Sequence, residues 1–496
     1  MRQLIIVLGT VMLLSPADAA SRPVTSPDFD GDGTVGFGDL VLFAGAFGSS
    51  AKEFDLDGDG VVGFSDFVIF ASRFGRAVPL TVDRLNFPLR ALHAAGNWGT
   101  NDAVVNDWET AGRTGPVVPP DYIDWLKSLH VNWVGLMISV HYDDSMDGTV
   151  ERVYSSVPDH RTFPDDALRQ MIRDFRDQGI EVYLTLFLND IEAGTADRPA
   201  HRWQLGDPRP PKDVLPVNWP WRPAHPDHQR FVAEFWESYT QQAVHFAKIA
   251  EAEGARMFSL GTETDALFRT RPGDPEDPVW TNDFSQQLRA MVARVRAVYS
   301  GLLTYDMHYG VLMDPVFWEP GSGHLWDDLQ LDVVGLSAWF PLLDTMPVGP
   351  ISIRAAQDKY QEIFETILIP LAERNPGRPI MFLEYGAADF VTAPLAPDRL
   401  APDGSGYAPF IFADANDNGV DDGHETQSNI YQALLNAMFD SPGVLDGVFF
   451  HDNWIAGDEL WAEWWAGQRS YSIRGKPAEN VVRKAYAAYK ENKDGD

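Results

Sequence analysis

Two glutamates, Glu263 and Glu384, stand where short apolar runs of the chain end. A pair of carboxyl groups can cleave a glycosidic bond, because one can protonate the leaving oxygen while the other attacks the anomeric carbon. A carboxyl separation of about 5 to 5.5 Å gives retention through a covalent intermediate, and a larger gap gives inversion. For either glutamate alone the alternative is a salt bridge at the rim of the fold, so the prediction requires that both come together.

Calcium binding is a second chemistry that the residue spacing predicts. Residues 28–39 and 55–66 share the pattern Asp-x-Asp-Gly-Asp-Gly-x-Val-Gly-Phe-x-Asp without a gap. Oxygen ligands at positions 1, 3, 5, 7 and 12 and a glycine at position 6 are typical of a twelve-residue calcium loop. The predicted ligands are Asp28, Asp30, Asp32, Thr34 and Asp39 in the first loop, and Asp55, Asp57, Asp59, Val61 and Asp66 in the second.

A third acidic loop, residues 414–425, fits the same pattern with glycine at position six and glutamate at position twelve. We expect a structural calcium ion that stiffens this loop, and no metal in the catalytic step. A solvated acidic turn is the alternative. The predicted ligands are Asp414, Asn416, Asn418, Val420, Asp422 and Glu425.

The elements that must hold the two glutamates begin near residue 89. Apolar runs typical of strands alternate there with amphipathic stretches typical of helices, such as 231–253 and 355–374. Eight such repeats predict an α/β fold, a (β/α)8 TIM barrel, because buried parallel strands read as continuous apolar runs. The eight runs are 89–94, 131–140, 181–188, 256–261, 302–307, 333–339, 380–384 and 447–450.

Polar and aromatic residues at the run ends are candidate substrate contacts, since the active site of such a barrel gathers at the C-terminal ends of its strands. Trp339 and Trp454 could stack on pyranose rings, although packing against the barrel wall would also explain them. His308 or Tyr309 could orient Glu384. The candidates are Asn97, Trp98, His141, Tyr142, Asn189, Thr262, His308, Tyr309, Trp339, Asp452 and Trp454.

With a glutamate after the fourth run and another at the seventh, the chain resembles the retaining clan of glycoside hydrolases called clan A. Within it the chain most resembles family 113, whose known members are β-mannanases. The matching stretches are Val-Asn-Trp-Val at 131–134, Gly-Thr-Glu at 261–263, Phe-Leu-Glu-Tyr-Gly at 382–386 and Gly-Lys-Pro-Ala at 475–478.

This resemblance extends over residues 89–489 and implies that Glu263 is the acid/base and Glu384 the nucleophile. One departure concerns the residue before the acid/base. Most clan members have asparagine there, and it binds the sugar 2-hydroxyl. This chain has Thr262, so Thr262 or another polar group must supply that contact.

The two N-terminal loops resemble the dockerin module of cellulosome enzymes, because position twelve is aspartate and no helix precedes each loop. The resemblance covers about a tenth of the chain. It implies a small all-α, EF-hand-like domain with structural calcium and a cohesin-like scaffold protein as partner. Dockerins usually lie at the C-terminus, whereas this pair lies near the N-terminus.

The bulk composition limits the partners. The 72 acidic and 39 basic residues give a formal net charge of −33, which disfavours nucleic acid and anionic membranes and suits a neutral polysaccharide. The chain has no cysteine, and its first twenty residues have the charged start, apolar core and Ala-x-Ala exit of a secretory signal. The predicted organisation is a signal peptide at 1–20, the dockerin-like pair at 25–76, a linker at 77–88 and the barrel at 89–492.

The sequence therefore predicts a secreted retaining glycoside hydrolase that cleaves a β-linked polysaccharide, with β-mannan favoured and sugar, linkage and endo or exo action left open. One alternative is a non-catalytic carbohydrate-binding or scaffold-tethered protein on a TIM-barrel frame. Another is a metal-dependent amidohydrolase, which needs a His-x-His motif at the end of strand one. The chain offers only His93 there.

Overall fold

The computed structural model describes residues 29, 35–51, 54–56, 60–74, 89–94, 100–142, 148–154, 161–190, 202, 226–268, 284–313, 315–318, 325–398, 409–464 and 466–494. The chain divides into two compact units, Met1–Thr81 and Val82–Asp496, and each is described here by itself. Several predictions lie outside the described residues: the signal peptide, the linker, and the roles of Asp28, Asp30, Asp32, Thr34, Asp57, Asp59, Asn97 and Trp98.

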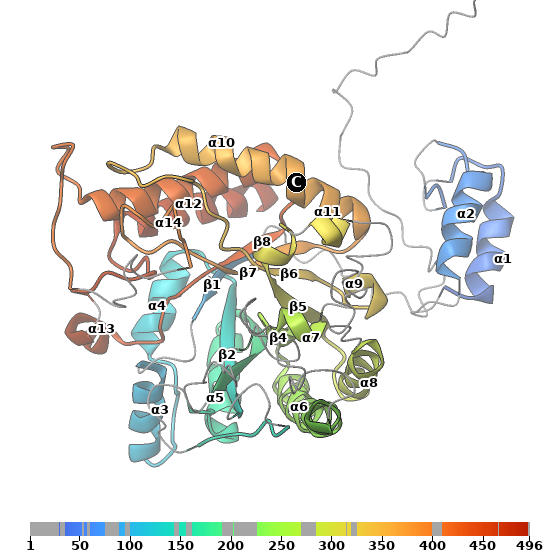
Figure 1. The fold of residues 1–496 in the computed structure, drawn as a ribbon, viewed down its shortest axis with the longest axis horizontal. Coiled ribbons are helices and arrows are strands. Elements are labelled where there is room, and N and C mark those ends of the chain that lie inside the picture. Colours follow the sequence, from blue (N-terminus) through green and yellow to red (C-terminus); the bar gives the residue numbers. More distant parts are fainter. Residues whose placement is uncertain are drawn as a thin grey trace, which may run out of the picture. The chain divides into compact units, whose positions relative to one another are not determined.

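In the second unit, the described residues form eight parallel strands that close into a barrel in sequence order (Figure 1). This confirms the predicted barrel, with a strand at each of the eight apolar runs. The strands are β1 (Leu89–His93), β2 (Trp133–Tyr142), β3 (Glu181–Asp190), β4 (Met257–Thr262), β5 (Leu302–His308), β6 (Val334–Ser337), β7 (Ile380–Tyr385) and β8 (Gly447–Phe450).

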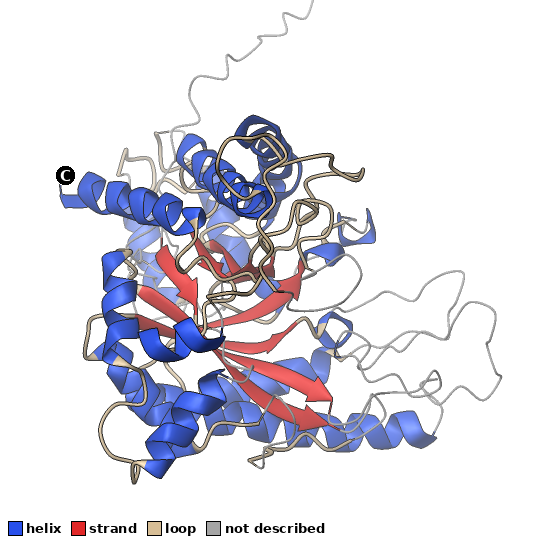
Figure 2. Ribbon diagram, turned by 90° about the vertical axis from the view of Figure 1, so that its left-hand side faces the viewer, coloured by secondary structure: helices blue, strands red, loops and turns tan. Residues whose placement is uncertain are grey.

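Helices surround the strands, which lie at the centre of the unit (Figure 2). Within the described residues, none of the helices is both long and apolar enough to cross a bilayer. The helices are α3 (Thr100–Thr110), α4 (Pro120–Ser128), α5 (Asp165–Arg176), α6 (Pro226–Glu253), α7 (Asp265–Phe268), α8 (Ser285–Arg296), η2 (Tyr309–Val311), η3 (Pro315–Trp318), α9 (Leu325–Asp328), α10 (Ile353–Ile363), η4 (Phe364–Leu368), α11 (Ile369–Arg374), α12 (Asp422–Asp440), α13 (Asp458–Trp464) and α14 (Pro477–Asp494).

The inside of the barrel is filled by large side chains from opposite strands, among them Trp133, Tyr183, Met381 and Phe449. Gly135 on β2 makes room for them, because a Cβ there would lie 3.2 Å from both Tyr183 and Phe449. A packed interior closes the barrel below the strand ends, so substrate can reach only the loops at its mouth.

The strands become irregular close to their C-terminal ends. The pairing register shifts between Ser259 and Thr262 on β4, between Leu336 and Ser337 on β6, and before Tyr385 on β7. The predicted sixth run continued to residue 339, but β6 ends at Ser337. Such bulges re-aim side chains next to active sites.

The first unit contains two helices, α1 (Phe37–Ala46) and α2 (Phe64–Arg73), each following one copy of the repeat. The aspartates at position twelve are buried and make matching bonds. Asp39 accepts from the Gly36 amide at 2.7 Å, and Asp66 accepts from the Gly63 amide at 2.6 Å. The sequence repeat is therefore also a repeat of local structure in the described residues.

Candidate active site

Glu263 follows β4 and Glu384 lies in β7, and both side chains are largely buried, with 9% and 6% exposure. Ser337 at the end of β6 lies between them. Its Oγ is 2.7 Å from Glu263 Oε1 and 2.8 Å from Glu384 Oε2. The two carboxylate oxygens are therefore at most about 5.5 Å apart, the sum of these distances, which is less than the roughly 6.5 to 9.5 Å that inversion needs.

The backbone of Glu263 is in the left-handed region, with φ of 52°. Its amide donates to the Asp306 carbonyl oxygen at 2.9 Å, which ties this turn to β5. A non-glycine residue in this region costs about 1 to 3 kcal/mol and persists only where the surroundings enforce it. The strained turn follows the β4 bulge and aims the carboxyl at the barrel mouth.

Arg202 lies directly on Glu263. Its Nη2 atom is 2.5 Å from Glu263 Oε2, and its guanidinium lies 4.0 Å from the centre of the Phe187 ring on β3. Burial opposes ionisation of Glu263, but the charges of Arg202 and His308 and the Ser337 hydrogen bond outweigh it, and the pKa of Glu263 is lowered.

Glu384 has a different environment. Burial and the negative charge of Glu263 raise the pKa of Glu384 to about 7, against the opposing effect of Arg202. His451 Nδ1 lies 3.4 Å from Glu384 Oε1, and Trp339 Nε1 lies 3.4 Å from Oε2. Burial, with the charges of His93 and Arg202, lowers the pKa of His451 well below its usual value, so His451 is neutral.

A third carboxyl, Asp306 on β5, lies close to the pair. Burial and the nearby Glu384 and Glu263 raise the pKa of Asp306 well above its usual value. Thr262, the sheet partner of Asp306, is buried, and its hydroxyl lies 2.7 Å from that of Thr185. Because Thr262 is turned into the barrel, the expected contact to a sugar 2-hydroxyl must come from another group.

The strand-end aromatic and histidine residues separate into two groups. Trp339 is 5% exposed, and its indole N–H lies 3.0 Å from Ser337 Oγ, so it belongs to the site. Trp454 is 1% exposed and packs with Ala456 and Trp461. Trp454 therefore packs inside the protein, as in the alternative of packing against the barrel wall, and its role as a sugar platform stays a prediction.

The prediction that His308 could orient Glu384 finds no contact in the described residues, and the electrostatic effect of His308 falls on Glu263, whose pKa it helps to lower. Its ring Nδ1 accepts the Gly310 amide and caps the turn η2. Tyr309 is partly buried and packs on the cluster that contains Trp339. Among the described residues, the direct contacts of Glu384 are with Ser337, Trp339 and His451.

The remaining predicted contacts are side chains of the barrel wall. His141, Tyr142 and Asp452 are each 1% exposed, and Asn189 is 8% exposed with its amide donating to Ser139 Oγ. Burial and the charge of Glu384 raise the pKa of Asp452 well above its usual value. This burial leaves these side chains little surface for a sugar.

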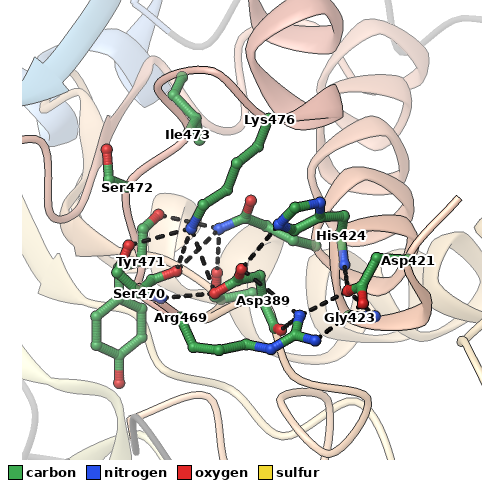
Figure 3. Close-up of polar contacts among 12 residues, drawn as sticks. Asp389, Asp421, Gly423, His424, Arg469, Ser470, Tyr471, Ser472, Ile473 and Lys476 are labelled. Carbon is green, nitrogen blue, oxygen red and sulfur yellow. Dashed lines mark hydrogen bonds and ion pairs between the residues drawn. The ribbon is translucent and has the colours of Figure 1, made fainter. Parts of the chain in front are cut away.

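A buried ionic cluster is centred on Asp389, with His424, Arg469 and Lys476 around it (Figure 3). Tyr471 packs on Trp339 with ring centroids 5.3 Å apart. Behind Tyr471, the fully buried Asp389 lies 3.3 Å from Lys476 Nζ and 3.1 Å from His424 Nε2. These contacts fasten the segment after β7 to the segment after β8.

Arg469 extends the cluster to the helix α12 (Figure 3). Its two terminal nitrogens lie 2.6 and 2.9 Å from the Asp421 carboxylate, and one of them also donates to the Asp389 carbonyl oxygen at 2.7 Å. Asp421 in turn accepts from the Gly423 and His424 amides and caps α12. The start of α12 is thus held against the barrel wall.

The loop 414–425 contains the cap residue Asp421 and runs into the first turn of α12. Asp414 accepts from the amides of Asn418 and Gly419, while Glu425 accepts from the side-chain amides of Asn416 and Asn418. Val420 donates its amide to Asn418, and Asp422 accepts from Ala415. Across the described part of the chain, no three His, Asp or Glu side chains are already arranged to hold a metal ion.

Sequence reasoning missed Ser337, Arg202 and Asp306. Ser337 had a usable signal, because it lies two residues before Trp339 and period-two alternation places both on one side of the strand. Asp306 is the polar residue inside an apolar run. Arg202 had no local signal, because it lies in a long Pro-rich stretch outside the strand–helix pattern.

Comparisons with known proteins agree with this geometry. The sequence model of Glycoside Hydrolase Family 113 matches residues 221–476, just over half of the chain. No curated protein matches.

Among solved structures, a family 113 β-1,4-mannanase complex is 20% identical with TM-score 0.51, covering 82% of this chain and 100% of its own. The family 113 β-mannanase AaManA from Alicyclobacillus acidocaldarius, in complex with ManMIm, is 22% identical with TM-score 0.52, covering 82% and 99%. At these identities the likeness shows the fold.

Proposed function

The chain belongs to Glycoside Hydrolase Family 113 and is a glycoside hydrolase, and from that premise we propose that it cleaves β-mannan with retention of configuration. The observation that carries the mechanism is the Ser337 hydroxyl, which bridges Glu263 and Glu384 with bonds of 2.7 and 2.8 Å. The resulting limit of about 5.5 Å leaves too little room for a water molecule between nucleophile and sugar.

In the proposed reaction Glu384 attacks the anomeric carbon while Glu263 protonates the leaving oxygen. Glu263 then takes a proton from water, and that water hydrolyses the glycosyl-enzyme. Trp339 and His451 hold the Glu384 carboxyl on two sides, at 3.4 Å each. Such fixed partners keep a nucleophile in attack geometry.

The choice of mannan is supported by the family and by the similar structures, each described as a mannanase. The formal net charge of −33 favours a neutral polymer over an anionic one.

The test is reducing-sugar release from mannan, glucan, xylan and galactan by the wild type and by Glu263→Gln and Glu384→Gln. We expect release from mannan that each substitution abolishes. Binding to mannan without release from any polymer would instead support a non-catalytic carbohydrate-binding protein. Release from another polymer alone would keep the reaction and change the substrate.

We also propose that residues 1–20 direct secretion and that the first unit is a dockerin-like calcium-binding module with a cohesin-like partner. The matched bonds of Asp39 and Asp66 support two equivalent loops. Large apolar residues at equivalent helix positions are exposed, with Phe37 at 74% and Phe64 at 72%. Calorimetric titration of the full chain with cohesins, against a Phe37→Ala/Phe64→Ala variant, tests the partner.

Calcium at the loop 414–425 is a separate proposal. Asn416 and Asn418 both donate their side-chain amides to Glu425 Oε2, and the three residues hold positions three, five and twelve of a calcium loop. Thermal unfolding of Glu425→Gln in EDTA and in calcium tests it, and we expect calcium to stabilise the barrel only when Glu425 is present.

A further inference from the structure

The Ser337 hydroxyl has three polar neighbours and only one hydrogen. Glu263 Oε1 lies at 2.7 Å, Glu384 Oε2 at 2.8 Å and Trp339 Nε1 at 3.0 Å. A hydroxyl offers one donor and two acceptor lone pairs. Because the indole N–H can only donate, it uses one lone pair of Ser337.

The remaining lone pair and the hydrogen of Ser337 face the two glutamates. The hydrogen can satisfy only one carboxylate, so the second glutamate must carry a proton of its own and donate it to Ser337. If neither glutamate carried a proton, Ser337 Oγ and a carboxylate oxygen would lie 2.8 Å apart in a buried site with no hydrogen between them. Such a contact is strongly unfavourable. The geometry therefore requires a single proton shared by the pair.

Arg202 decides where that proton resides. Its guanidinium, 2.5 Å from Glu263 Oε2, stabilises a negative charge on Glu263, so the proton lies on Glu384 in the free enzyme. The pKa of Glu263 is lowered and that of Glu384 is raised, in agreement with this placement. The other titratable or charged groups around the pair are Asp265, Asp306, His308, His93, His451, Asp452, Tyr183 and Tyr471.

This resting state is the reverse of what the proposed reaction needs, since the acid is ionised and the nucleophile is protonated. Glu263 Oε1 faces Ser337 and Oε2 faces Arg202. A leaving-group oxygen must approach on the Oε2 side, where Arg202 lies. Substrate binding therefore has to separate Arg202 from Glu263, and loss of that positive charge makes Glu263 a better proton acceptor.

We propose that Ser337 relays the proton of Glu384 to Glu263 when substrate displaces Arg202. The Glu384 O–H bond breaks as its proton joins Ser337 Oγ, and the original hydrogen of Ser337 moves to Glu263 Oε1. No electron is exchanged, and the charge of the three groups is unchanged. The Glu263 carboxyl then turns about its broad terminal torsion and presents the proton to the leaving oxygen. This inference rests on the proposed roles of the two glutamates.

Ser337→Ala tests the relay on two mannosides with different leaving groups. A sugar leaving group needs a proton, whereas 2,4-dinitrophenolate leaves without one. We expect Ser337→Ala to lower kcat/KM by roughly 10²-fold on mannotetraose at pH 6, and only a few-fold on 2,4-dinitrophenyl β-mannobioside at pH 8, where Glu384 is ionised without the relay. An equal loss on both substrates would show that Ser337 only positions Glu384, and would overturn the relay.

Thr304→Val is the matched control, because Thr304 is also a buried strand hydroxyl but donates to the Val333 carbonyl oxygen. We expect it to leave the ratio of the two kcat/KM values unchanged. Far-ultraviolet circular dichroism of both variants checks folding.

Rates in mixtures of H2O and D2O give a second measurement. Wild-type kcat/KM on mannotetraose should curve with the deuterium fraction, because two protons move together, and Ser337→Ala should give a straight line. The same curvature in both enzymes would exclude a hydroxyl relay.

Infrared difference spectra locate the resting proton without turnover. At pH 6, Glu384→Gln should remove a protonated-carboxyl band of the wild type. Persistence of that band in Glu384→Gln would place the proton elsewhere and overturn the relay while leaving retention intact. A wild type that cleaves no glycoside, with these spectra as expected, would refute the proposed function and leave the shared proton standing.

Discussion

At the residue scale, Glu263 and Glu384 have the same chemistry and differ only through their neighbours. Arg202 and the strained turn act on Glu263, while burial and the charge of Glu263 act on Glu384. Two carboxyl groups whose pKa values are pushed apart can divide acid and nucleophile roles between them. The residue types alone do not contain this difference, because it arises from contacts between distant strands.

The pH dependence of kcat/KM follows from the raised pKa of Glu384, about 7. Below that pH the pair holds the one proton that acid catalysis needs, and above it both groups are carboxylates. The profile of kcat/KM reports the free enzyme. We therefore expect kcat/KM on mannotetraose to fall above pH 7, measured under substrate-limited conditions.

A fall already complete near pH 5 would contradict this assignment. It would mean that Glu263 itself must hold the proton in the free enzyme, where its pKa is lowered. The dinitrophenyl mannoside is the control, because its departure needs no acid, although its attack still needs ionised Glu384.

Azide separates the roles of the two glutamates. In Glu263→Ala, azide should attack the glycosyl-enzyme and give a β-glycosyl azide, whereas in Glu384→Ala it should take the place of the nucleophile and give the α-anomer. Loss of the acid should cost about 10²- to 10⁴-fold on mannotetraose. Nuclear magnetic resonance of the products identifies the anomer, and exchanged outcomes would exchange the roles.

At the element scale, the strands were predictable and their ends were not. Each apolar run became a strand because continuous hydrophobicity is typical of a buried parallel sheet. Glu263 and Glu384 were predictable for the same reason, as polar residues that end such runs. The bulge at Ser337 and the approach of Arg202 depend on tertiary packing, which no local pattern records. The burial of Trp454, which the sequence left open, also depends on tertiary packing.

The segments after β7 and β8 depend on Asp389, which is fully buried among cations. Although burial opposes ionisation, Lys476 and His424 hold the pKa of Asp389 below its usual value. Asp389→Asn leaves the buried Lys476 without its counter-ion, so we expect the free energy of unfolding to fall by about 3 to 5 kcal/mol. Urea denaturation at pH 7 measures it.

The exposed pair of Asp358 with Arg354, 3.9 Å apart, gives the matched control. Asp358→Asn should cost less than about 1 kcal/mol, because exposed pairs contribute little. Equal effects of the two substitutions would show that the buried cluster does not support the wall.

The stability that Asp389 contributes depends on pH. Because the pKa of Asp389 is lowered in the folded protein, this contribution is present at neutral pH and is lost as the pH falls through the pKa of the folded state.

At the scale of the whole molecule, the two compact units carry separate chemistry. The described residues of the candidate active site all belong to the unit Val82–Asp496, and the paired aspartates Asp39 and Asp66 belong to the other. Carboxylates at calcium-loop spacing repel one another without a cation, whereas the barrel has a large apolar core of its own. Removal of calcium should therefore affect the two units unequally.

We expect EDTA to abolish a low-temperature transition of the full chain in differential scanning calorimetry and to leave kcat/KM on mannotetraose within about twofold, since the proposed acid and nucleophile are carboxyl groups rather than metal ligands. A chain that starts at Val82 should lack that transition in calcium as well and retain the same kcat/KM. A large loss of kcat/KM in EDTA that the shorter chain also shows would trace the effect to the barrel, with the loop at 414–425 as its source. A loss confined to the full chain would instead mean that the unfolded first unit interferes with the barrel.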